Sequence, residues 1–161
     1  MGRSRSGFVR WLRGRRVFLS YRGIDSSEIA GRIDDRLVAR FGRRRVVNYL
    51  QTFPLGVDFR EHIVSVIPAC DAVLAVIGPD WLSSRSDGLR PIDDPRDMVR
   101  VELQCAFAHG VRIIPVLVGS ARMPEARELP ESIRKLVDLQ SVSIRVDPDF
   151  HHDVSRLIAA L

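Results

Sequence analysis

A continuous apolar run at residues 72–77 (AVLAVI) constrains the fold of this chain more than any other feature. Asp71 precedes the run and Gly78 and Pro79 end it, so the run is much too short to cross a membrane. A strand with one solvated face would alternate apolar and polar side chains, whereas this run has no polar position. It therefore predicts a strand that is covered on both faces, as in the centre of a parallel sheet.

Further β-prone runs alternate with helical patterns along the chain. Besides residues 72–77, we expect strands at residues 17–21, 46–50, 111–118 and 140–146. We expect helices at residues 59–67, 97–110, 131–137 and 152–161, and one that carries Ile29, Ile33, Leu37 and Phe41 with Asp25 or Ser26 as its N-cap. Pro115 inside the fourth strand predicts an edge position or a bulge. This alternation predicts an α/β domain of the flavodoxin-like, doubly wound class, with a five-stranded parallel sheet and helices on both faces.

The formal net charge is +5, and the basic residues concentrate at the start of the chain. Six arginines fall within the first sixteen residues, and the remainder is close to neutral. We therefore expect residues 1–15 to form a basic, flexible leader and residues 16–161 to form one domain. The leader can contact nucleic acid or anionic lipid, but the neutral body does not predict a nucleic-acid-binding face.

Cys70 and Cys105 are the only cysteines, and both lie in apolar surroundings. Their spacing fits neither a disulfide framework nor a metal site, which favours a reducing, cytoplasmic setting. His151, His152 and Asp153 are adjacent on a predicted helix and point in different directions, so we expect no metal site there. No apolar stretch is long enough to predict a membrane span.

Residues 97–110 predict a helix with two neighbouring stripes, and either Asp94 or Asp97 is positioned to favour its start. One stripe is apolar and the other is mixed, and their members are Val99, Leu103, Ala106 and Phe107 on the first and Met98, Glu102, Cys105 and His109 on the second. Glu102 is therefore expected at the margin of the buried face. A carboxylate at that position is either a surface charge, stabilised by the helix dipole and by Arg96 or Arg100, or a reagent in a cleft.

Ligands of open parallel sheets collect beyond the carboxyl ends of the strands. Residues 20–23 follow the first predicted strand, and residues 53–56 lie in the loop after the second. Residues 78–81 follow the third strand and lead through a polar loop to the helix that carries Glu102. These segments therefore predict where a ligand binds.

Several signatures of other α/β proteins are missing. The sequence contains no P-loop and no G-x-G-x-x-G after the first strand, so it does not predict a dehydrogenase-type dinucleotide site. A phosphoacceptor domain needs acidic residues after the first strand and an aspartate at the end of the third, whereas residues 21–23 and 77–79 read YRG and IGP. Ser20 and Ser65 lack the elbow context of a nucleophilic serine.

Four motifs, in order and at the proper spacing, resemble the Toll/interleukin receptor (TIR) domain family in its bacterial form. RVFLSYR at residues 16–22 resembles the first motif, and QTFPLGVDFR at residues 51–60 resembles the loop after the second strand. CDAVLAVIGPDWL at residues 70–82 resembles the third strand and its exit. MVRVEL at residues 98–103 resembles the segment in which the family shows Trp-x-x-x-Glu, with Met98 in place of the tryptophan. Tyr49 and Gln51 stand where the family commonly has other residues, one of them acidic.

The resemblance implies one of two functions, since many members cleave NAD⁺ and others are assembly modules. In the enzymatic members the glutamate of the last motif is catalytic, which corresponds to Glu102. The residues that the resemblance places in NAD binding are Tyr21, Arg22, Gly23, Phe53 and Met98. It also implies a self-association loop, which consists of Pro54, Leu55 and Gly56.

A single carboxylate suits the cleavage of NAD⁺ between nicotinamide and ribose. The leaving group is already a pyridinium cation, so no general acid is needed, in contrast to ordinary glycosidases. A lone carboxylate can hydrogen-bond the ribose hydroxyls and stabilise the oxocarbenium-like charge of the transition state. Capture of the ribosyl cation by water gives hydrolysis, and capture by a group of the same molecule gives cyclisation.

The sequence therefore favours a cytoplasmic TIR domain that hydrolyses or cyclises NAD⁺ in bacterial defence or signalling and is activated by self-association. We expect NAD⁺ as a substrate, with no cofactor and no metal. The expected partners are other TIR domains and a sensor domain or protein outside this chain. The alternative is a non-enzymatic module that binds other TIR domains.

Overall fold

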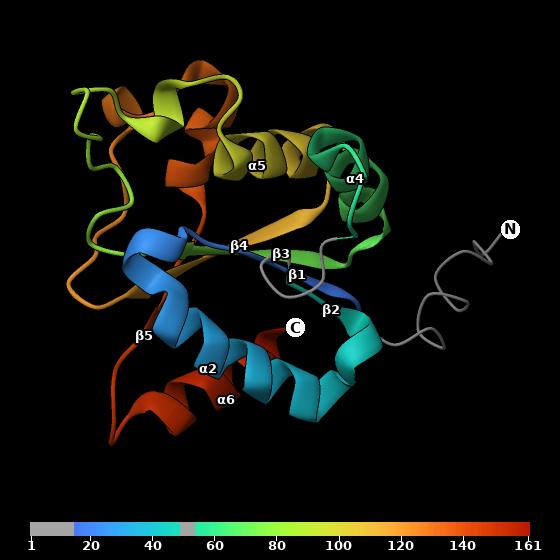
Figure 1. The fold of residues 1–161 in the computed structure, drawn as a ribbon. Helices are drawn as coiled ribbons and strands as arrows, with labels where there is room; N and C mark the ends of the chain where they lie inside the picture. The colour runs from blue at the N-terminus through green and yellow to red at the C-terminus, as the bar shows by residue number, and fades with distance from the viewer. Residues whose placement is uncertain (1–14, 49–53) are drawn as a thin grey trace, which may run out of the picture.

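The computed structural model describes residues 15–48 and 54–161, in which helices cover both faces of a central sheet (Figure 1). Five parallel strands lie in the order β2-β1-β3-β4-β5. Their bounds are Val17–Ser20 for β1, Val46–Val47 for β2, Ala72–Ile77 for β3, Arg112–Val118 for β4 and Val142–Ile144 for β5. The predicted flavodoxin-like, doubly wound sheet is therefore confirmed.

Two hydrophobic clusters hold the helices against the sheet. On one face lie α2 (Gly23–Phe41) and α6 (Phe150–Ala160), which run side by side below the sheet in Figure 1. On the other face lie α4 (Phe59–Val66), α5 (Met98–Ala108) and the 3₁₀ helix η5 (Glu131–Asp138). Shorter 3₁₀ turns are η1 (Arg43–Arg45), η2 (Ile67–Ala69), η3 (Pro91–Asp93) and η4 (Ala126–Glu128).

The apolar run of β3 occupies the centre of the sheet. Each of its six side chains is buried, and Val73 pairs in register with Phe18 of β1 and Ile113 of β4. Side chains that alternate between the two faces of β3 enter different clusters, Val73 one and Leu74 the other. A strand buried in this way needs apolar residues at every position, which explains the continuous run in the sequence.

Pro115 lies in an internal strand, so its predicted edge position is wrong. Pro115 pairs with Ala75 of β3 on one side, but β4 pairs with β5 only from Val116 onward. In the described sheet no strand accompanies Pro115 on the β5 side, so a residue without an N–H is tolerated there.

The helix starts agree with the sequence in one case and differ in another. Of the two aspartates expected at the start of α5, Asp94 and Asp97, it is Asp97 that caps the helix, and its side chain accepts a hydrogen bond from the amide of Arg100 at 3.1 Å. The predicted N-cap of α2 at Asp25 or Ser26 is wrong, because α2 begins at Gly23 with Arg22 as its N-cap. The amide of Ser26 already bonds the carbonyl of Arg22 at 3.2 Å, so Ser26 lies inside the helix.

Some predictions fall on residues outside the described part of the chain. These are the leader as far as residue 14, the end of the second predicted strand with Tyr49, and Gln51 and Phe53. Within residues 15–48 and 54–161 no helix is both long and apolar enough to cross a membrane.

Candidate active site

A hollow of about 400 Å³ opens beyond the carboxyl end of β1, and we call it the cleft. Three segments line the cleft: the end of β1 with the residues that follow it, the loop after β3, and the first turns of α5 with the residue before them. Their members are Leu19, Tyr21, Arg22, Gly23 and Ile24, then Asp80, Ser83, Ser84, Arg85 and Pro91, and finally Asp97, Met98, Val99 and Glu102. The predicted ligand position at the carboxyl ends of the strands thus coincides with a real depression.

Glu102 is the buried acidic group of the cleft. It projects from the second turn of α5, and only 4% of its surface is exposed. The sequence predicts Glu102 at the margin of the buried face, but the residue is fully inside because the β1 side of the cleft covers it. Its Oε2 atom and the Oγ atom of Ser20 are both buried, and neither completes a hydrogen bond of good geometry with a described residue, although the Ser20 hydroxyl lies close enough to favour the charged carboxylate.

Burial sets the protonation of Glu102. Loss of water around the carboxylate, with a smaller contribution from the negative charge of Asp97, raises the pKa of Glu102 to about 8. The neighbouring Ser20 hydroxyl and the Arg22 guanidinium oppose this shift without cancelling it. The carboxyl group is therefore largely protonated at neutral pH in the free protein, and a cationic ligand in the cleft favours its ionisation.

Arg22 lines the cleft, but its guanidinium is held by the protein. Its two Nη atoms donate to the Asp97 carboxylate at 2.8 and 2.9 Å, and its Nε donates to the Trp81 carbonyl at 3.0 Å. The guanidinium carbon also lies 5.6 Å from the centroid of the Trp81 ring. Arg22 therefore joins the ends of β1 and β3 to the start of α5, and it does not ion-pair with Glu102.

This set of contacts extends the sequence prediction. The family resemblance implies Arg22 as a ligand-binding residue, and the sequence offers Asp97 or Asp94 at the helix start, but it does not predict that Arg22 and Asp97 pair. They are 75 residues apart, and no local pattern signals a contact over that distance. Asp97 serves α5 and Arg22 at once, so it fixes the turn from which Glu102 projects.

The other predicted NAD-binding residues are placed as follows. Tyr21, Gly23 and Met98 line the cleft, and Phe53 is outside the described residues. The Tyr21 hydroxyl donates to Oδ1 of Asn48 at 3.2 Å, and burial raises the pKa of Tyr21. Met98 is 40% exposed at the mouth. The structure thus brings Tyr21, Gly23, Met98 and Glu102 together around one depression.

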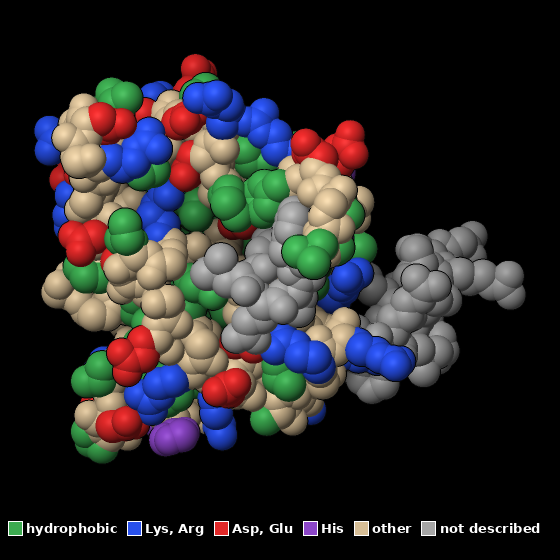
Figure 2. Space-filling model, in the orientation of Figure 1, with side chains coloured by type: hydrophobic (Ala, Val, Ile, Leu, Met, Phe, Trp, Pro, Cys, Tyr) green, Lys and Arg blue, Asp and Glu red, His purple; other side chains and the backbone are tan. Residues whose placement is uncertain are grey.

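Pro54, Leu55 and Gly56, the predicted self-association loop, lie outside the residues that line the cleft. Leu55 is 97% exposed, and Gly56 has a φ of +78°, which favours glycine at that turn. Hydrophobic side chains gather on the face drawn in Figure 2, between the level of α5 and that of α2. No described residue covers the Leu55 side chain, so it is available for contact with another molecule.

The wall of the cleft depends on a close approach of α2 to the end of β3. The Asp25 carboxylate accepts hydrogen bonds from the Asp80 amide at 3.1 Å and from the Ser26 hydroxyl at 2.6 Å. A Cβ atom at Gly78 would collide with the Asp25 and Ser26 side chains of α2, so a larger residue there would force these side chains to move. Asp25, which the sequence suggests as a cap, instead holds the loop that leads into the cleft.

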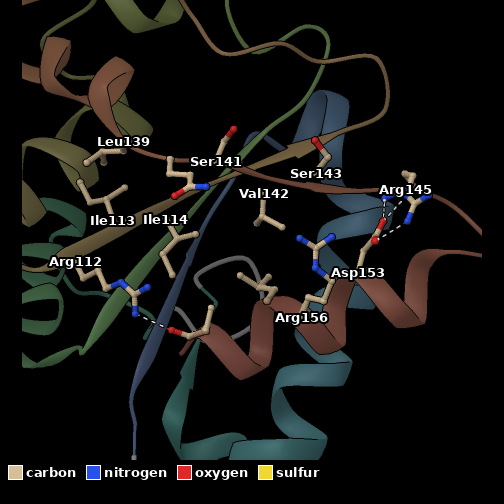
Figure 3. Close-up of a pocket in the computed structure, with 13 residues that line it drawn as sticks. Arg112, Ile113, Ile114, Leu139, Ser141, Val142, Ser143, Arg145, Asp153 and Arg156 are labelled. Carbon is tan, nitrogen blue, oxygen red and sulfur yellow. Dashed lines mark hydrogen bonds and ion pairs between the residues drawn. The ribbon is translucent and has the colours of Figure 1, made fainter.

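A second hollow, of about 700 Å³, lies along β4, β5 and α6 (Figure 3). Three of its charged groups, Arg112, Arg145 and Asp153, have partners within the fold. Arg145 binds both oxygens of Asp153 at 2.8 Å, and Arg112 donates to the carbonyl of Ala160 at 2.7 Å. None of its lining residues carries a buried polar atom without a partner in the described part of the chain. This hollow is therefore a weaker candidate for chemistry than the smaller cleft.

A third hollow, of about 730 Å³, lies at the opposite edge of the sheet and is lined by Arg16, Arg44 and Arg45. The helices α2 and α5 end near this edge, and cations stabilise helix carboxyl ends. Arg44 and Arg45 lie just beyond the carboxyl end of α2, where this role applies, whereas Nε of Arg16 is buried without a partner among the described residues. No group of three His, Cys, Asp or Glu side chains within residues 15–48 and 54–161 is arranged to hold a metal ion, and His151 and His152 are exposed.

Comparison with known proteins identifies the fold. A family model described as the TIR domain matches residues 17–158. No curated protein matches the sequence. The TIR domains of the activated Roq1 resistosome, which recognises the effector XopQ, have a TM-score of 0.66 and 12% identity, and the match covers 91% of this chain and 98% of that one.

Two further solved structures are similar. A metazoan TIR-STING receptor from C. gigas, in complex with 2′,3′-cGAMP, has a TM-score of 0.53 and 21% identity over 88% of this chain and 38% of that one. The CMP N-glycosidase BcmB of Clostridium botulinum has a TM-score of 0.50 and 19% identity, with coverage of 91% and 100%. At these identities the similarity establishes the fold alone.

Proposed function

This chain belongs to the TIR domain family, and on that premise we propose that it cleaves the N-glycosidic bond of NAD⁺ and releases nicotinamide, with Glu102 as the catalytic residue. The observation that carries the proposal is the state of this carboxyl group. Glu102 is buried beside a cleft and has an oxygen without a partner among the described residues. A buried polar group of this kind costs stability, so its retention favours a role in binding or catalysis.

The chemistry requires Glu102 in its ionised form. As the bond to nicotinamide breaks, positive charge moves onto the ribose, and a carboxylate in a low-dielectric cleft stabilises it strongly. The pyridinium leaves as neutral nicotinamide and takes no proton. The positive charge of bound NAD⁺ lowers the cost of ionising Glu102, so binding prepares the carboxylate for the reaction.

The proposed binding residues surround this carboxylate. Tyr21, Gly23 and Met98 contribute the mouth and wall of the cleft, and Phe53 is proposed from the sequence resemblance alone. Arg22 contributes by holding the cleft together, because its donors are directed to Asp97 and to the Trp81 carbonyl. NAD⁺ is a substrate in this proposal, and no cofactor or metal takes part.

One structural relative is described as a CMP N-glycosidase, so cleavage of the same type of bond is found on this fold. CMP has a neutral leaving base, which needs a proton from a general acid. NAD⁺ needs no proton but does need the carboxylate. The two substrate classes therefore require opposite protonation states of Glu102.

The direct test measures nicotinamide released from NAD⁺ by the purified protein, by Glu102→Gln and by Glu131→Gln. Glu131 is exposed at the start of η5 and provides a matched control for the same chemical change. We expect Glu102→Gln to lose activity by roughly 10³-fold and Glu131→Gln to retain it. Equal turnover by wild type and Glu102→Gln contradicts the assignment, and the product profile distinguishes hydrolysis from cyclisation.

The pH dependence tests the substrate class. Because kcat/KM reports the free protein and burial raises the pKa of Glu102 to about 8, kcat/KM for NAD⁺ should rise with pH and level off above about 8. A substrate with a neutral leaving base should show the opposite trend. A profile for NAD⁺ that is flat between pH 6 and pH 9 argues against Glu102 as the ionising group.

The exposure of Leu55 supports a second candidate function, self-association of TIR domains without catalysis. In the favoured proposal, the same contact activates the enzyme in bacterial defence or signalling in the cytoplasm. A sensor domain or protein outside this chain then controls the assembly. No turnover in concentrated solution, together with weaker self-association of Leu55→Asp, favours the scaffold alone.

A further inference from the structure

We propose that the backbone amides at the start of α2, those of Gly23 and Ile24, bind the phosphate that is attached to the nicotinamide ribose. The inference rests on the proposed function and specifies how the cleft recognises its substrate. It predicts that the recognised unit is a mononucleotide, and that the second nucleotide of NAD⁺ lies beyond the cleft.

The start of α2 differs from the starts of α4 and α5. Asp58 caps α4 by accepting from the amides of Arg60 and Glu61, and Asp97 caps α5. The N-cap of α2 is Arg22, whose side chain makes no capping hydrogen bond. The first amides of this 19-residue helix therefore have no protein acceptor in the described part of the chain, and they carry the positive end of the helix dipole.

Arg22 is the obvious alternative anchor for a phosphate, but its contacts argue against that role. Each of the three nitrogen atoms of its guanidinium already donates one hydrogen bond, Nε to the Trp81 carbonyl and the two Nη atoms to Asp97. Two of its five N–H donors remain, one on each Nη atom, but the ion pair with the largely buried Asp97 carboxylate fixes their direction and already offsets the charge of Arg22. The amides of Gly23 and Ile24, next in the chain, have no such partner in the described part of the chain.

A second observation places a ligand at the same depression. Gly23, Ile24 and Glu102 all line the cleft, and the buried Glu102 has no partner for Oε2 among the described residues. A ligand that satisfies Glu102 with its ribose can direct its phosphate to α2. The volume of about 400 Å³ lies near the lower end for small-molecule sites and suits one nucleotide unit.

The charges near the start of α2 allow an anion there. Asp25 is in the first turn, but its carboxylate oxygens accept from Ser26 and Asp80 and not from the free amides. Arg85 lines the cleft and is half exposed, with Asp87 at 3.7 Å as a loose partner. Arg85 can therefore add a positive charge beside the phosphate at little cost.

The test removes one amide and keeps the helix. Gly23 is the first helical residue, where proline is well tolerated, and Arg22 has the extended conformation (φ −92°, ψ 126°) that precedes proline. Gly23→Pro deletes the N–H, and Gly23→Ala keeps it while adding a side-chain carbon. Each protein is tested with nicotinamide mononucleotide and with nicotinamide riboside, which lacks the phosphate. Circular dichroism verifies that both variants retain the fold.

The readout is the preference for the phosphorylated compound, measured both as the ratio of kcat/KM and as the ratio of binding constants from calorimetry. We expect wild type and Gly23→Ala to prefer the mononucleotide, and Gly23→Pro to lose about tenfold or more of that preference. An unchanged preference in Gly23→Pro overturns the inference, as does a wild type that treats both compounds alike. Preferential binding without turnover supports the phosphate site and contradicts the proposed catalysis. Turnover without a preference for the mononucleotide supports the proposed catalysis and contradicts the phosphate site.

Discussion

Glu102 and Asp153 are both buried carboxylates beside a hollow, and they differ in every other respect. Asp153 is 1% exposed and accepts two hydrogen bonds from the Arg145 side chain and one from its amide. These bonds hold the pKa of Asp153 well below its usual range. Glu102 is similarly buried but has an oxygen without a partner among the described residues, and burial raises its pKa to about 8.

The difference separates a structural carboxylate from a candidate reagent. Asp153 ties α6 to the end of β5, and Figure 3 shows its contact with Arg145. Its charge is satisfied before any ligand arrives. Glu102 has the positive Arg22 nearby, but Arg22 is committed to Asp97. The protein leaves one carboxylate incompletely satisfied, at the edge of the sheet where ligands of such folds bind.

The largest effect on stability is expected from Asp153→Asn. The variant removes the charge of the buried partner in a bidentate ion pair and places an amide NH₂ group against the Arg145 donors, although Arg145 itself is half exposed. Thermal unfolding should therefore show a large loss of Tm. Asp149→Asn is the matched control, because Asp149 contacts the same Arg145 from a half-exposed position and should change Tm little. Equal losses in the two variants contradict the structural role of Asp153.

Glu102→Gln should change stability in the opposite direction. A carboxyl group whose pKa is raised by folding binds more protons in the folded state, so wild-type stability falls as pH rises from about 4.5 to about 8. The variant lacks this dependence. Its advantage in the free energy of unfolding should grow from near zero at pH 4 to on the order of 5 kcal/mol above pH 8. Denaturant unfolding at several pH values measures the gap, and a constant gap contradicts the raised pKa.

Gly78→Ala tests a third carboxylate, Asp25, which is satisfied like Asp153 but supports the cleft. The new Cβ displaces the Asp25 carboxylate from the Asp80 amide. We expect a loss of about 1–2 kcal/mol in the free energy of unfolding. Gly31→Ala, in the same helix as Asp25 and with open space around its Cβ, should be neutral or slightly stabilising. A neutral Gly78→Ala variant shows that the wall of the cleft can relax.

Leu55→Asp should have the smallest effect on stability, within about 0.5 kcal/mol, because the side chain is already exposed. Leu55→Asp therefore shows how little a substitution at an exposed position changes stability, in comparison with the substitutions at the buried carboxylates. Its effect should appear in self-association, measured by sedimentation velocity across a concentration series. Leu89→Asp, an exposed leucine in a different loop, is the control and should leave self-association intact. Equal weakening by both substitutions points to a general charge effect instead of a specific loop.

The elements that the sequence predicts well are those with a local pattern. The apolar run of β3 and the Asp97 cap of α5 agree with the structure because each depends on neighbouring residues only. The predictions for Pro115 and for the start of α2 are wrong for the opposite reason. The tolerance of Pro115 depends on where pairing with β5 begins, and the first turn of α2 depends on contacts of Asp25 and Ser26 with the β3 exit.

For the candidate site, the residues at the carboxyl ends of the strands, the family and the choice of Glu102 all follow from the sequence. How these residues are used depends on the tertiary structure. The burial of Glu102 and the pairing of Arg22 with Asp97 arise when separate segments converge at one sheet edge. Solvation and ion pairing depend on distance in space, and a pattern along the chain does not contain it.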